Sequence, residues 1–418
     1  MKKLLSILML VCLTLSLFAG CAQKPQEPAD PKNPVVDPTE PTDPTEPAEP
    51  SEPTEPDVPE EPSEPDPDAV YDVDGKLFLY ANPIVAVRDG EYEIIIDAMN
   101  EGNNYIVIDG KVYRAEDTID DSFNIYKIRV KQSALDTAKT YAVCYKGEGD
   151  EVAHGKEFTF RPLEKEEGIN VIVLSDIHTE YRAAKTELKY FGDDLDLIVF
   201  NGDIESSLNS ADQTIKIQRF FAEVSKGQIP VLFARGNHEY LGEGWIYYND
   251  YLSDNGKSYY KFSMGAIEGL IIDAEPLGIF GSDSVTEKGD NLDMIREENA
   301  FLNGVTLDNG KINFVVSHID PNTYNAWDGL YDEMCARIND LKIDFFIAGH
   351  EHLNFITEPN SPVSLQPHDY TIINGCMASE TEKHSCIALT LFKDKVSVTF
   401  VDSKLNVMDS AEITYPNY

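Results

Sequence analysis

Five short apolar runs along the chain each end in side chains that can bind metal ions or transfer protons. The groups that follow the runs are Ser175-Asp176-Ile177-His178, Asn201-Gly202-Asp203, Arg235-Gly236-Asn237-His238-Glu239, Ser317-His318 and Gly349-His350-Glu351-His352. Five of the eight histidines of the chain belong to these groups. A single histidine beside a strand is usually structural, but the same placement in successive groups predicts a shared site.

The mixture of carboxylate, amide and imidazole side chains indicates the kind of metal that such a site binds. These donors together suit hard-to-borderline divalent ions, whereas a closed structural zinc site needs only four ligands. Seven residues are candidate ligands: Asp176, His178, Asp203, Asn237, His318, His350 and His352. We therefore expect an open site for two divalent ions (Zn, Mn, Fe or Ca) that share a bridging carboxylate and support hydrolysis.

The local geometry of these groups can also be predicted. Asp176 and His178 are two residues apart, and on an extended segment their side chains point the same way. His350 and His352 repeat this spacing. Glycines at positions 202, 236 and 349 should allow the sharp turns that bring the side chains together.

The elements that must position the groups alternate between strand and helix. The apolar runs are Asn170–Leu174, Leu195–Phe200, Pro230–Phe233, Ile312–Val316 and Ile343–Ala348. Helical stretches at Ala183–Phe191 and Ser210–Lys226 separate the first three runs, which is the βαβ signature. Ligands of such sheets bind at the carboxyl ends of the strands, so we expect all five groups to meet there.

The order of these groups resembles that of the calcineurin-like metallophosphoesterase superfamily, over about residues 169–402. The shared pattern is Asp-x-His, Gly-Asp, Gly-Asn-His-Glu, a later His, and Gly-His-x-His. The resemblance implies a four-layer α/β sandwich of two mixed β-sheets flanked by helices. It also implies two overlapping ligand sets that share Asp203: Asp176, His178, Asp203 and His352 for one ion, and Asp203, Asn237, His318 and His350 for the other.

The same resemblance implies a phosphoric ester hydrolase. A hydroxide held by the two metal ions would attack phosphorus, and His238 would act as general acid toward the leaving oxygen. We expect a small phosphorylated substrate and favour a phosphomonoester. A phosphodiesterase or nucleotidase of the same fold, and a non-catalytic binding lipoprotein displayed on the surface, are the alternatives.

Some positions depart from well-known branches of the superfamily. Purple acid phosphatases carry Tyr where this chain has Ser206, and Gly where it has His178, so a ferric ion bound by tyrosinate is not expected. Ser/Thr protein phosphatases carry Asp and Arg at the positions of Ser206 and Ser207. The residues that orient the catalytic histidine and grip phosphate in those enzymes are therefore missing here.

Three residues are secondary candidates for these missing tasks. Glu205 or Glu239 is a candidate to orient His238, and Arg235 is a candidate to contact phosphate. The alternative for Arg235 is an ion pair with Glu239 or a neighbouring carboxylate.

A strand-rich region precedes the metal-binding pattern. Short runs of β-branched and aromatic residues between Val70 and Leu163, separated by turns such as Asp109-Gly110, predict six or seven strands and an antiparallel β-sandwich. Leu135 and Tyr141 resemble the tyrosine corner of fibronectin-III-like domains. Such a domain before a catalytic one resembles the arrangement in purple acid phosphatases. Its role, binding or spacing, stays open.

The N-terminus is typical of a secreted, anchored protein. Lys2 and Lys3 precede an apolar run that ends at Ala19-Gly20-Cys21, which resembles a bacterial lipobox and implies a lipid on Cys21. Ordinary secretion is the alternative. Proline recurs at every third position from Pro38 to Pro65, with acidic and small residues between, which favours an extended stalk.

These patterns divide the chain into four parts. We predict a lipoprotein signal peptide (1–20), a stalk (21–68), a fibronectin-III-like β-sandwich (69–165) and a metallophosphoesterase domain (166–418), anchored to the bacterial cell membrane outside the cytoplasm. The chain has 34 Lys and Arg against 74 Asp and Glu, a net charge of −40. This charge argues against binding a nucleic-acid backbone, which requires clustered cations. Nothing in the sequence indicates an oligomeric state.

The loops predicted to set specificity carry aromatic residues that either stack on a substrate or pack the loops. The loops are Tyr240–Gly256, Glu275–Asp293 and Asp320–Leu330, and their aromatic residues include Trp245, Tyr247, Tyr248, Tyr324 and Trp327. Cys376 and Cys386 could form a disulfide in an oxidising compartment. His368 and His384 are expected to be structural or exposed.

Overall fold

The computed structural model describes residues 71–72, 77–115, 123–274, 288–322, 329–376 and 384–416. All of them belong to one compact unit, which runs from Pro62 to Tyr418. The predictions about the signal peptide, Cys21 and the stalk lie outside the described residues, as do Tyr324 and Trp327. Within the described part, no helix has both the length and the apolar character needed to cross a membrane.

The first part of this unit, residues 71–163, is rich in strands, as predicted, and is called here the β region. Its elements are β1 (Tyr71–Asp72), β2 (Ile84–Val87), β3 (Glu91–Ala98), β4 (Asn103–Ile108), β5 (Lys111–Tyr113), β6 (Asn124–Lys131), α2 (Gln132–Ala138), β7 (Thr140–Lys146) and β8 (Ala153–Thr159). Five strands form one sheet in the order β1-β8-β7-β4-β5. Inward side chains of β4, β7 and β8 join those of β2, β3 and β6 in one apolar cluster.

The rest of the unit alternates strands with helices before it ends in three antiparallel strands. Its helices are α3 (Tyr181–Glu187), η2 (Gly192–Asp194), α4 (Ala211–Ser225), η3 (His238–Tyr240), α5 (Trp245–Tyr251), α6 (Lys288–Gly304) and α7 (Leu330–Asp340). Its strands are β9 (Ile169–Leu174), β10 (Leu197–Asn201), β11 (Val231–Ala234), β12 (Tyr260–Met264), β13 (Ile267–Ile271), β14 (Ile312–Val316), β15 (Phe345–Ala348), β16 (Phe355–Thr357), β17 (Thr371–Asn374), β18 (Ser385–Leu391), β19 (Lys395–Asp402) and β20 (Val407–Thr414).

Together with β2, β3 and β6, these strands form two mixed sheets. One has nine strands in the order β20-β19-β18-β9-β10-β11-β2-β3-β6, and the other has six in the order β12-β13-β14-β15-β17-β16. In the first sheet β9, β10 and β11 are parallel, and in the second β13, β14, β15 and β17 are parallel. Parallel strands present their carboxyl ends at one edge, which is where the predicted ligand groups begin.

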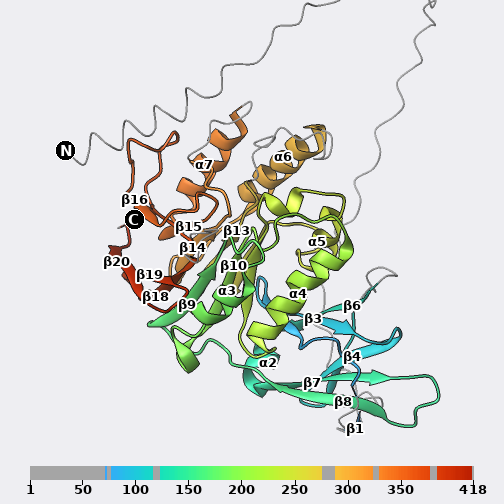
Figure 1. The fold of residues 1–418 in the computed structure, drawn as a ribbon. Coiled ribbons are helices and arrows are strands. Elements are labelled where there is room, and N and C mark those ends of the chain that lie inside the picture. Colours follow the sequence, from blue (N-terminus) through green and yellow to red (C-terminus); the bar gives the residue numbers. More distant parts are fainter. Residues whose placement is uncertain are drawn as a thin grey trace, which may run out of the picture. The chain divides into compact units, whose positions relative to one another are not determined.

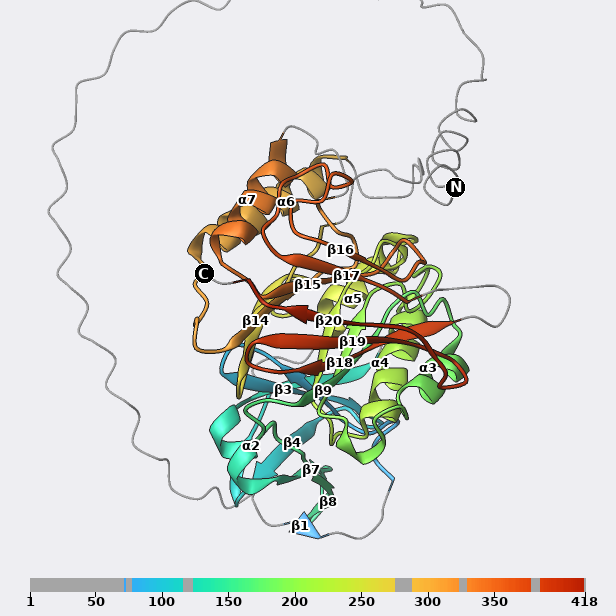
Figure 2. The same ribbon diagram turned by 90° about the vertical axis from the view of Figure 1, so that its left-hand side faces the viewer.

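Alternate side chains place the two sheets face to face with helices outside. Val171 and Val173 of β9 join the core shared by both sheets, whereas Ile172 and Leu174 pack beneath the helices α3, α4 and α5. On the other sheet, α6 and α7 cover the outer face through a separate apolar cluster. Figure 1 and Figure 2 show these two groups of helices against their sheets. The predicted mixed α/β fold, with two mixed sheets flanked by helices, is confirmed.

The β region shares a sheet with the remainder of the unit. β2 pairs in parallel with β11 through Ala86 and Val231, so β2, β3 and β6 extend the nine-stranded sheet. Strands from both sides of the boundary predicted near residue 165 therefore belong to the same sheet. Tyr141 also contacts the other part, because its hydroxyl donates to the carbonyl oxygen of Gly227 at 2.9 Å. A tyrosine corner bonds to its own domain, so that interpretation of Tyr141 is wrong.

The cysteines of the described residues are free thiols. Cys144, Cys335, Cys376 and Cys386 are all buried, and the Sγ of Cys376 donates to the carbonyl oxygen of Val173. The Cys376–Cys386 disulfide considered from the sequence is therefore not formed in this structure.

Candidate metal centre and active site

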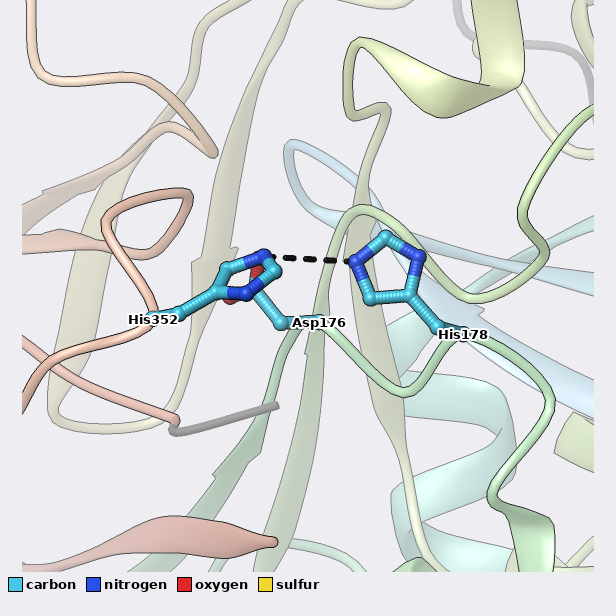
Figure 3. Close-up of side chains that lie close together, drawn as sticks. All are labelled: Asp176, His178 and His352. Atoms are coloured by element: carbon cyan, nitrogen blue, oxygen red, sulfur yellow. Dashed lines mark hydrogen bonds and ion pairs between the residues drawn. The ribbon is translucent and has the colours of Figure 1, made fainter. Parts of the chain in front are cut away.

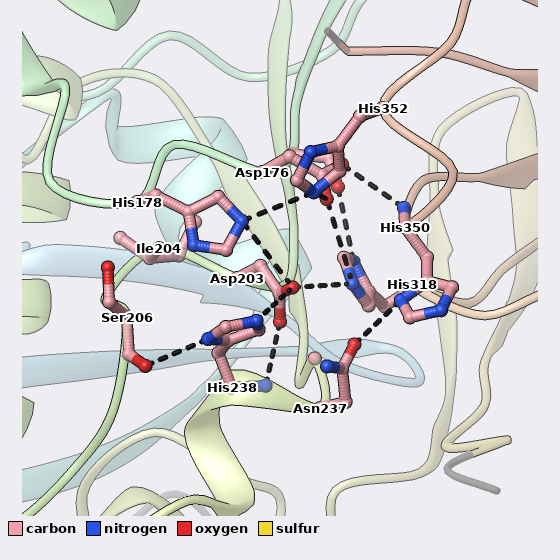
Figure 4. A network of polar contacts seen from close by, with 12 residues as sticks. Asp176, His178, Asp203, Ile204, Ser206, Asn237, His238, His318, His350 and His352 are labelled. Carbon is pink, nitrogen blue, oxygen red and sulfur yellow. Dashed lines mark hydrogen bonds and ion pairs between the residues drawn. The ribbon is translucent and has the colours of Figure 1, made fainter. Parts of the chain in front are cut away.

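The structure brings the predicted ligands together at the carboxyl ends of strands from both sheets (Figure 4). Three overlapping groups have ligand atoms within 4.8 Å of one another. They are Asp176, His178 and His352; His178, Asp203 and His238; and Asp203, His318 and His350. Asn237 completes the predicted set, since its Oδ1 lies 2.8 Å from Nδ1 of His350. All seven candidate ligands and His238 therefore lie in one cluster.

The first group, shown in Figure 3, joins the end of β9 to the loop after β15. The Nε2 atoms of His178 and His352 are 3.3 Å apart, and Oδ1 of Asp176 lies 3.2 Å from His352 Nε2. The His352 side chain is 42% exposed, whereas Asp176 is fully buried. The group is thus open to solvent on the His352 side, as a site that admits a substrate requires.

The backbone conformation of the ligands differs from the prediction. Asp176 and His178 have φ values of 52° and 42°, and His350 and His352 have φ values of 69° and 52°. These residues therefore lie in the left-handed region, and the expected extended segments are wrong. Asp203, with φ 53°, shares this conformation. Left-handed non-glycine residues cost about 1–3 kcal/mol each and gather at functional sites, where surrounding contacts hold them in place.

Hydrogen bonds between neighbouring loops hold two of these strained residues. The amide of His178 donates to the carbonyl oxygen of Asp203 at 3.0 Å, and the amide of Asp176 donates to that of Gly202 at 3.1 Å. The loops after β9 and β10 are thus joined along their backbones, which fixes the spacing of the Asp176 and Asp203 carboxylates.

Two glycines allow this close approach by lacking a side chain. A Cβ on Gly236 would lie 2.3 Å from Oδ1 of Asp203, and one on Gly349 would lie 2.2 Å from Oγ of Ser175. Neither glycine has a positive φ, so both are required for close contact and not, as predicted, for a sharp turn.

Asp203 lies at the centre of the cluster. Its Oδ2 is 3.1 Å from Nε2 of His318 and 3.8 Å from Nε2 of both His178 and His238. Burial alone would raise the pKa of this carboxyl, but the facing His318, with His238 and His178, holds the pKa well below its usual range. For His318, burial lowers the pKa, and the charges of Asp203 and Asp176 outweigh this and raise it to about 10. The pocket therefore favours positive charge beside Asp203.

Two buried atoms show that this positive charge fits a metal ion. Within the described residues, Oδ1 of Asp176 and Nε2 of His318 make no hydrogen bond, although both are shielded from solvent. The Nδ1 of His318 faces the carbonyl oxygen of Asn201 at 2.7 Å and must donate to it, so Nε2 is the ring atom that faces Asp203. The raised pKa places a proton on this Nε2, and a metal ion would replace that proton and take the lone pair. Carboxylate, imidazole and amide donors of this kind fit divalent ions.

His238 is oriented by the main chain. Its Nδ1 lies 2.8 Å from the carbonyl oxygen of Ser206, so Nδ1 donates and Nε2 faces the Asp203 side of the site. The sequence had suggested Glu205 or Glu239 for this task, and neither residue performs it. Glu205 instead accepts a hydrogen bond from the Tyr181 hydroxyl.

Glu239 holds together two loops that carry candidate metal ligands. Its buried carboxylate accepts hydrogen bonds from the amides of Asp203, Gly236 and Ile204 at 2.8–2.9 Å, and a longer one from Glu205. Burial, and then the charge of Asp203, raises the pKa of Glu239 to about 7. The carboxylate therefore satisfies the orphan amides of the loops after β10 and β11.

The guanidinium of Arg235 bonds to residues outside the set of candidate ligands. Its buried guanidinium pairs with Asp273 at 2.7 Å and lies over the ring of Tyr240. The alternative of an ion pair with a nearby carboxylate is therefore the correct one, and the partner is Asp273, not Glu239. Asp273 is distant in sequence, and no local pattern indicated it.

Several other predicted residues have packing roles. Trp245 stacks on Tyr240 with 6.4 Å between ring centroids, and the Tyr248 hydroxyl donates to the carbonyl oxygen of Ala234. His384 is buried against Glu187 at 2.8 Å, and His368 is buried beside Tyr370, so both are structural, as expected.

Comparison with known proteins identifies the class of enzyme. Residues 169–354 match the family model described as calcineurin-like phosphoesterase. No curated protein matches the chain. Residues 169–354 thus form a calcineurin-like metallophosphoesterase domain whose His and Asp groups can hold a metal centre. The protein is accordingly a phosphoesterase, a hydrolase of phosphoric esters.

Solved structures resemble this chain to different degrees. A purple acid phosphatase from yellow lupin (Lupinus luteus) seeds has 12% sequence identity and a TM-score of 0.56, over 80% of this chain and 74% of that chain. A structure of PhoD has 10% identity and a TM-score of 0.49, over 81% of this chain and 90% of that chain. At 12% identity the likeness to the yellow lupin structure concerns the fold alone.

Proposed function

We propose that the protein is a phosphatase that removes phosphate from small phosphomonoesters with the help of two divalent metal ions. The observation that carries this proposal is the position of Asp203, whose carboxylate faces His178, His238 and His318 at once. A carboxylate shared by two groups of donors is what a bridged pair of ions requires. The choice of monoesters over diesters is decided by the kinetic comparison below.

The chain supplies binding, orientation and proton transfer. Metal ions held here would stabilise charge on the phosphoryl oxygens and lower the pKa of the attacking water. Asp176, His178 and His352 would hold one ion, and Asn237, His318 and His350 the other, with Asp203 common to both. The hydrogen bond from Nδ1 to Ser206 leaves Nε2 of His238 to carry a proton for the leaving oxygen.

A kinetic comparison tests this function. The purified protein would be reconstituted with Zn, Mn, Fe or Ca and assayed with p-nitrophenyl phosphate and bis-p-nitrophenyl phosphate. We expect faster turnover of the monoester, and loss of turnover in Asp203→Ala and His238→Ala. His154→Ala, at a histidine on β8, is the matched control and should retain full activity. Turnover of neither ester with any metal would contradict the proposal.

We further propose that the enzyme acts at the cell surface, anchored by lipid on Cys21. The support is the sequence alone, namely the apolar leader that ends in Ala19-Gly20-Cys21 and the proline-rich stalk after it. In a bacterial host, the protein should partition into the membrane fraction, and Cys21→Ser should release it or leave it unprocessed. Recovery of the wild-type protein in the cytoplasm would contradict this proposal.

A further inference from the structure

A buried arginine of the β region contacts the loop that follows α5. Arg88, in the turn between β2 and β3, donates to Oε2 of Glu93 at 2.6 Å and to the carbonyl oxygen of Leu252 at 3.1 Å. Its guanidinium also lies 4.5 Å from the ring centroid of Tyr260. Arg88 is only 1% exposed, so water and salt do little to weaken these contacts.

Two cations of β6 contact the segment 250–254, which includes the end of α5 and the residues after it. Nζ of Lys127 donates to the carbonyl oxygens of Ser253, at 2.6 Å, and Asp250, at 3.4 Å. Arg129 pairs with the carboxylate of Asp254 and, at 3.0 Å, with that of Glu93. The segment 250–254 therefore receives contacts from three cations of the β region.

Helix α5 and the segment after it in turn support the loop that carries Asn237 and His238. The Tyr248 hydroxyl donates to the carbonyl oxygen of Ala234 at 3.0 Å, and Oδ1 of Asn249 accepts from Arg235 at 2.9 Å. Ser258 also contacts Arg235, at 3.1 Å. Ala234 and Arg235 directly precede Gly236-Asn237-His238. An unbroken set of contacts thus leads from β6 through α5 to the candidate acid and one candidate ligand.

We infer that the β region is a positioning part of the hydrolase, and that Lys127 is a positioning residue which holds the 250–254 segment so that His238 keeps its place. This inference rests on the proposed function, because it assigns the β region to the same site. A separate binding or spacing module would not need a buried arginine and a largely shielded lysine directed at carbonyl groups of the 250–254 segment. A displacement of about 1 Å in a reacting group can reduce turnover strongly, which gives such support its value.

Arg161 provides a matched control for Lys127. Both are cations of the β region that donate to two backbone carbonyls of the phosphoesterase part. The carbonyls that Arg161 contacts, those of Asp193 and Leu195, lie before the amino end of β10, at the opposite end of that strand from Asp203. Loss of the Arg161 contacts should therefore weaken the attachment of the β region without disturbing His238.

The experiment compares Lys127→Met with Arg161→Met in the full chain by hydrogen exchange of amides 236–240 and by kcat for p-nitrophenyl phosphate. We expect Lys127→Met to speed exchange and to lower kcat on the order of 10-fold at unchanged metal content, with recovery in Lys127→Arg. Arg161→Met should lower thermal stability and change neither readout. Arg129→Gln, at a side chain 25% exposed, is a milder variant that should act in the same direction as Lys127→Met.

Equal exchange and equal kcat in the two Met variants would overturn the inference. Should the wild-type protein turn over no ester, the proposed function fails, whereas the exchange comparison still decides whether Lys127 positions the loop. The two failures are therefore distinguishable.

Discussion

The carbonyl oxygen of Ser206 lies 2.8 Å from Nδ1 of His238 and sets the direction of its ring. A carbonyl can only accept, so Nδ1 donates and Nε2 faces the side of Asp203. The partner belongs to the main chain, so the orientation of His238 does not depend on the side chain at position 206. The side chain at position 206 is therefore not needed for this orientation.

Substitution of the serine side chain should therefore be tolerated. Ser206→Ala keeps the carbonyl, and we expect kcat within about twofold of wild type, the range of a neutral surface change. His238→Ala should lower kcat by about 100-fold or more, because it removes the proton donor. Assays with p-nitrophenyl phosphate at equal metal content check both. A large loss in Ser206→Ala would show that the hydroxyl orients the ring.

The close approach at Gly236 should make even a methyl group harmful. In Gly236→Ala the new Cβ would lie 2.3 Å from Oδ1 of Asp203, so one of the loops must move. We expect a loss of about 1–3 kcal/mol in the free energy of unfolding and weaker metal binding. Gly304→Ala is the control, because nothing lies within 4 Å of its Cβ. Thermal unfolding and metal analysis measure both variants, and equal behaviour would contradict the prediction.

Metal ions should stabilise the fold through Asp203. A ligand that binds only the native state at 100 times its Kd adds about 2.7 kcal/mol of stability. Removal of metal with a chelator should lower the Tm of the wild-type protein, and Zn or Mn should restore it. In Asp203→Asn most of this shift should disappear, while His154→Ala should keep it. The idea fails if Asp203→Asn responds to metal as strongly as wild type does.

Glu298 should make stability depend on pH. Burial, and then the charge of Asp273, raises the pKa of this carboxyl to about 8, above its ordinary value of 4.5. The folded state thus holds a proton that the unfolded state has lost, so stability should fall as pH rises from about 5 to 8 and stay level above that. Its Oε1 accepts from the Asp273 amide at 2.8 Å, a contact that glutamine can preserve.

The Glu298→Gln variant measures this effect. Its stability relative to wild type should increase across the same pH range, by on the order of a few kcal/mol, because the amide cannot ionise. Denaturant unfolding of both proteins at pH 5, 7 and 9 gives the comparison. A constant difference at all three pH values would show that Glu298 does not titrate in this range.

The sequence predicted the residues of the site better than the contacts that hold these residues in place. Asp176, Asp203 and His318 each follow a continuous apolar run, and parallel strands bring their carboxyl ends to one edge, so their meeting follows from local patterns. The pairing of Arg235 with Asp273 does not, because no periodicity connects residues that are distant in the chain. The left-handed backbone at Asp176 could not be predicted from the sequence either. It is stabilised by a contact from the neighbouring loop and not by the Asp176 side chain.

The fold shows the same limit. Strands of the β region were visible as β-branched runs, but their membership of the nine-stranded sheet rests on one parallel pair, Ala86 with Val231. Pairing between strands far apart in sequence leaves no signature in either segment. The main-chain carbonyl that orients His238 is invisible for a similar reason, because every residue carries a carbonyl.

The nine-stranded sheet joins early and late parts of the described chain, from β2 to β20. β2, β3 and β6 leave the ribosome before β9, whose residue Val173 must later pair with Ile387 of β18. During synthesis one edge of β2 thus stays unpaired until β11 has been made, and one edge of β9 stays unpaired until β18 has been made. Pairings of such long range are slow and leave unpaired edges exposed. The strand β9, which ends just before Asp176, is therefore flanked on one side by a strand that is made after all the candidate ligands.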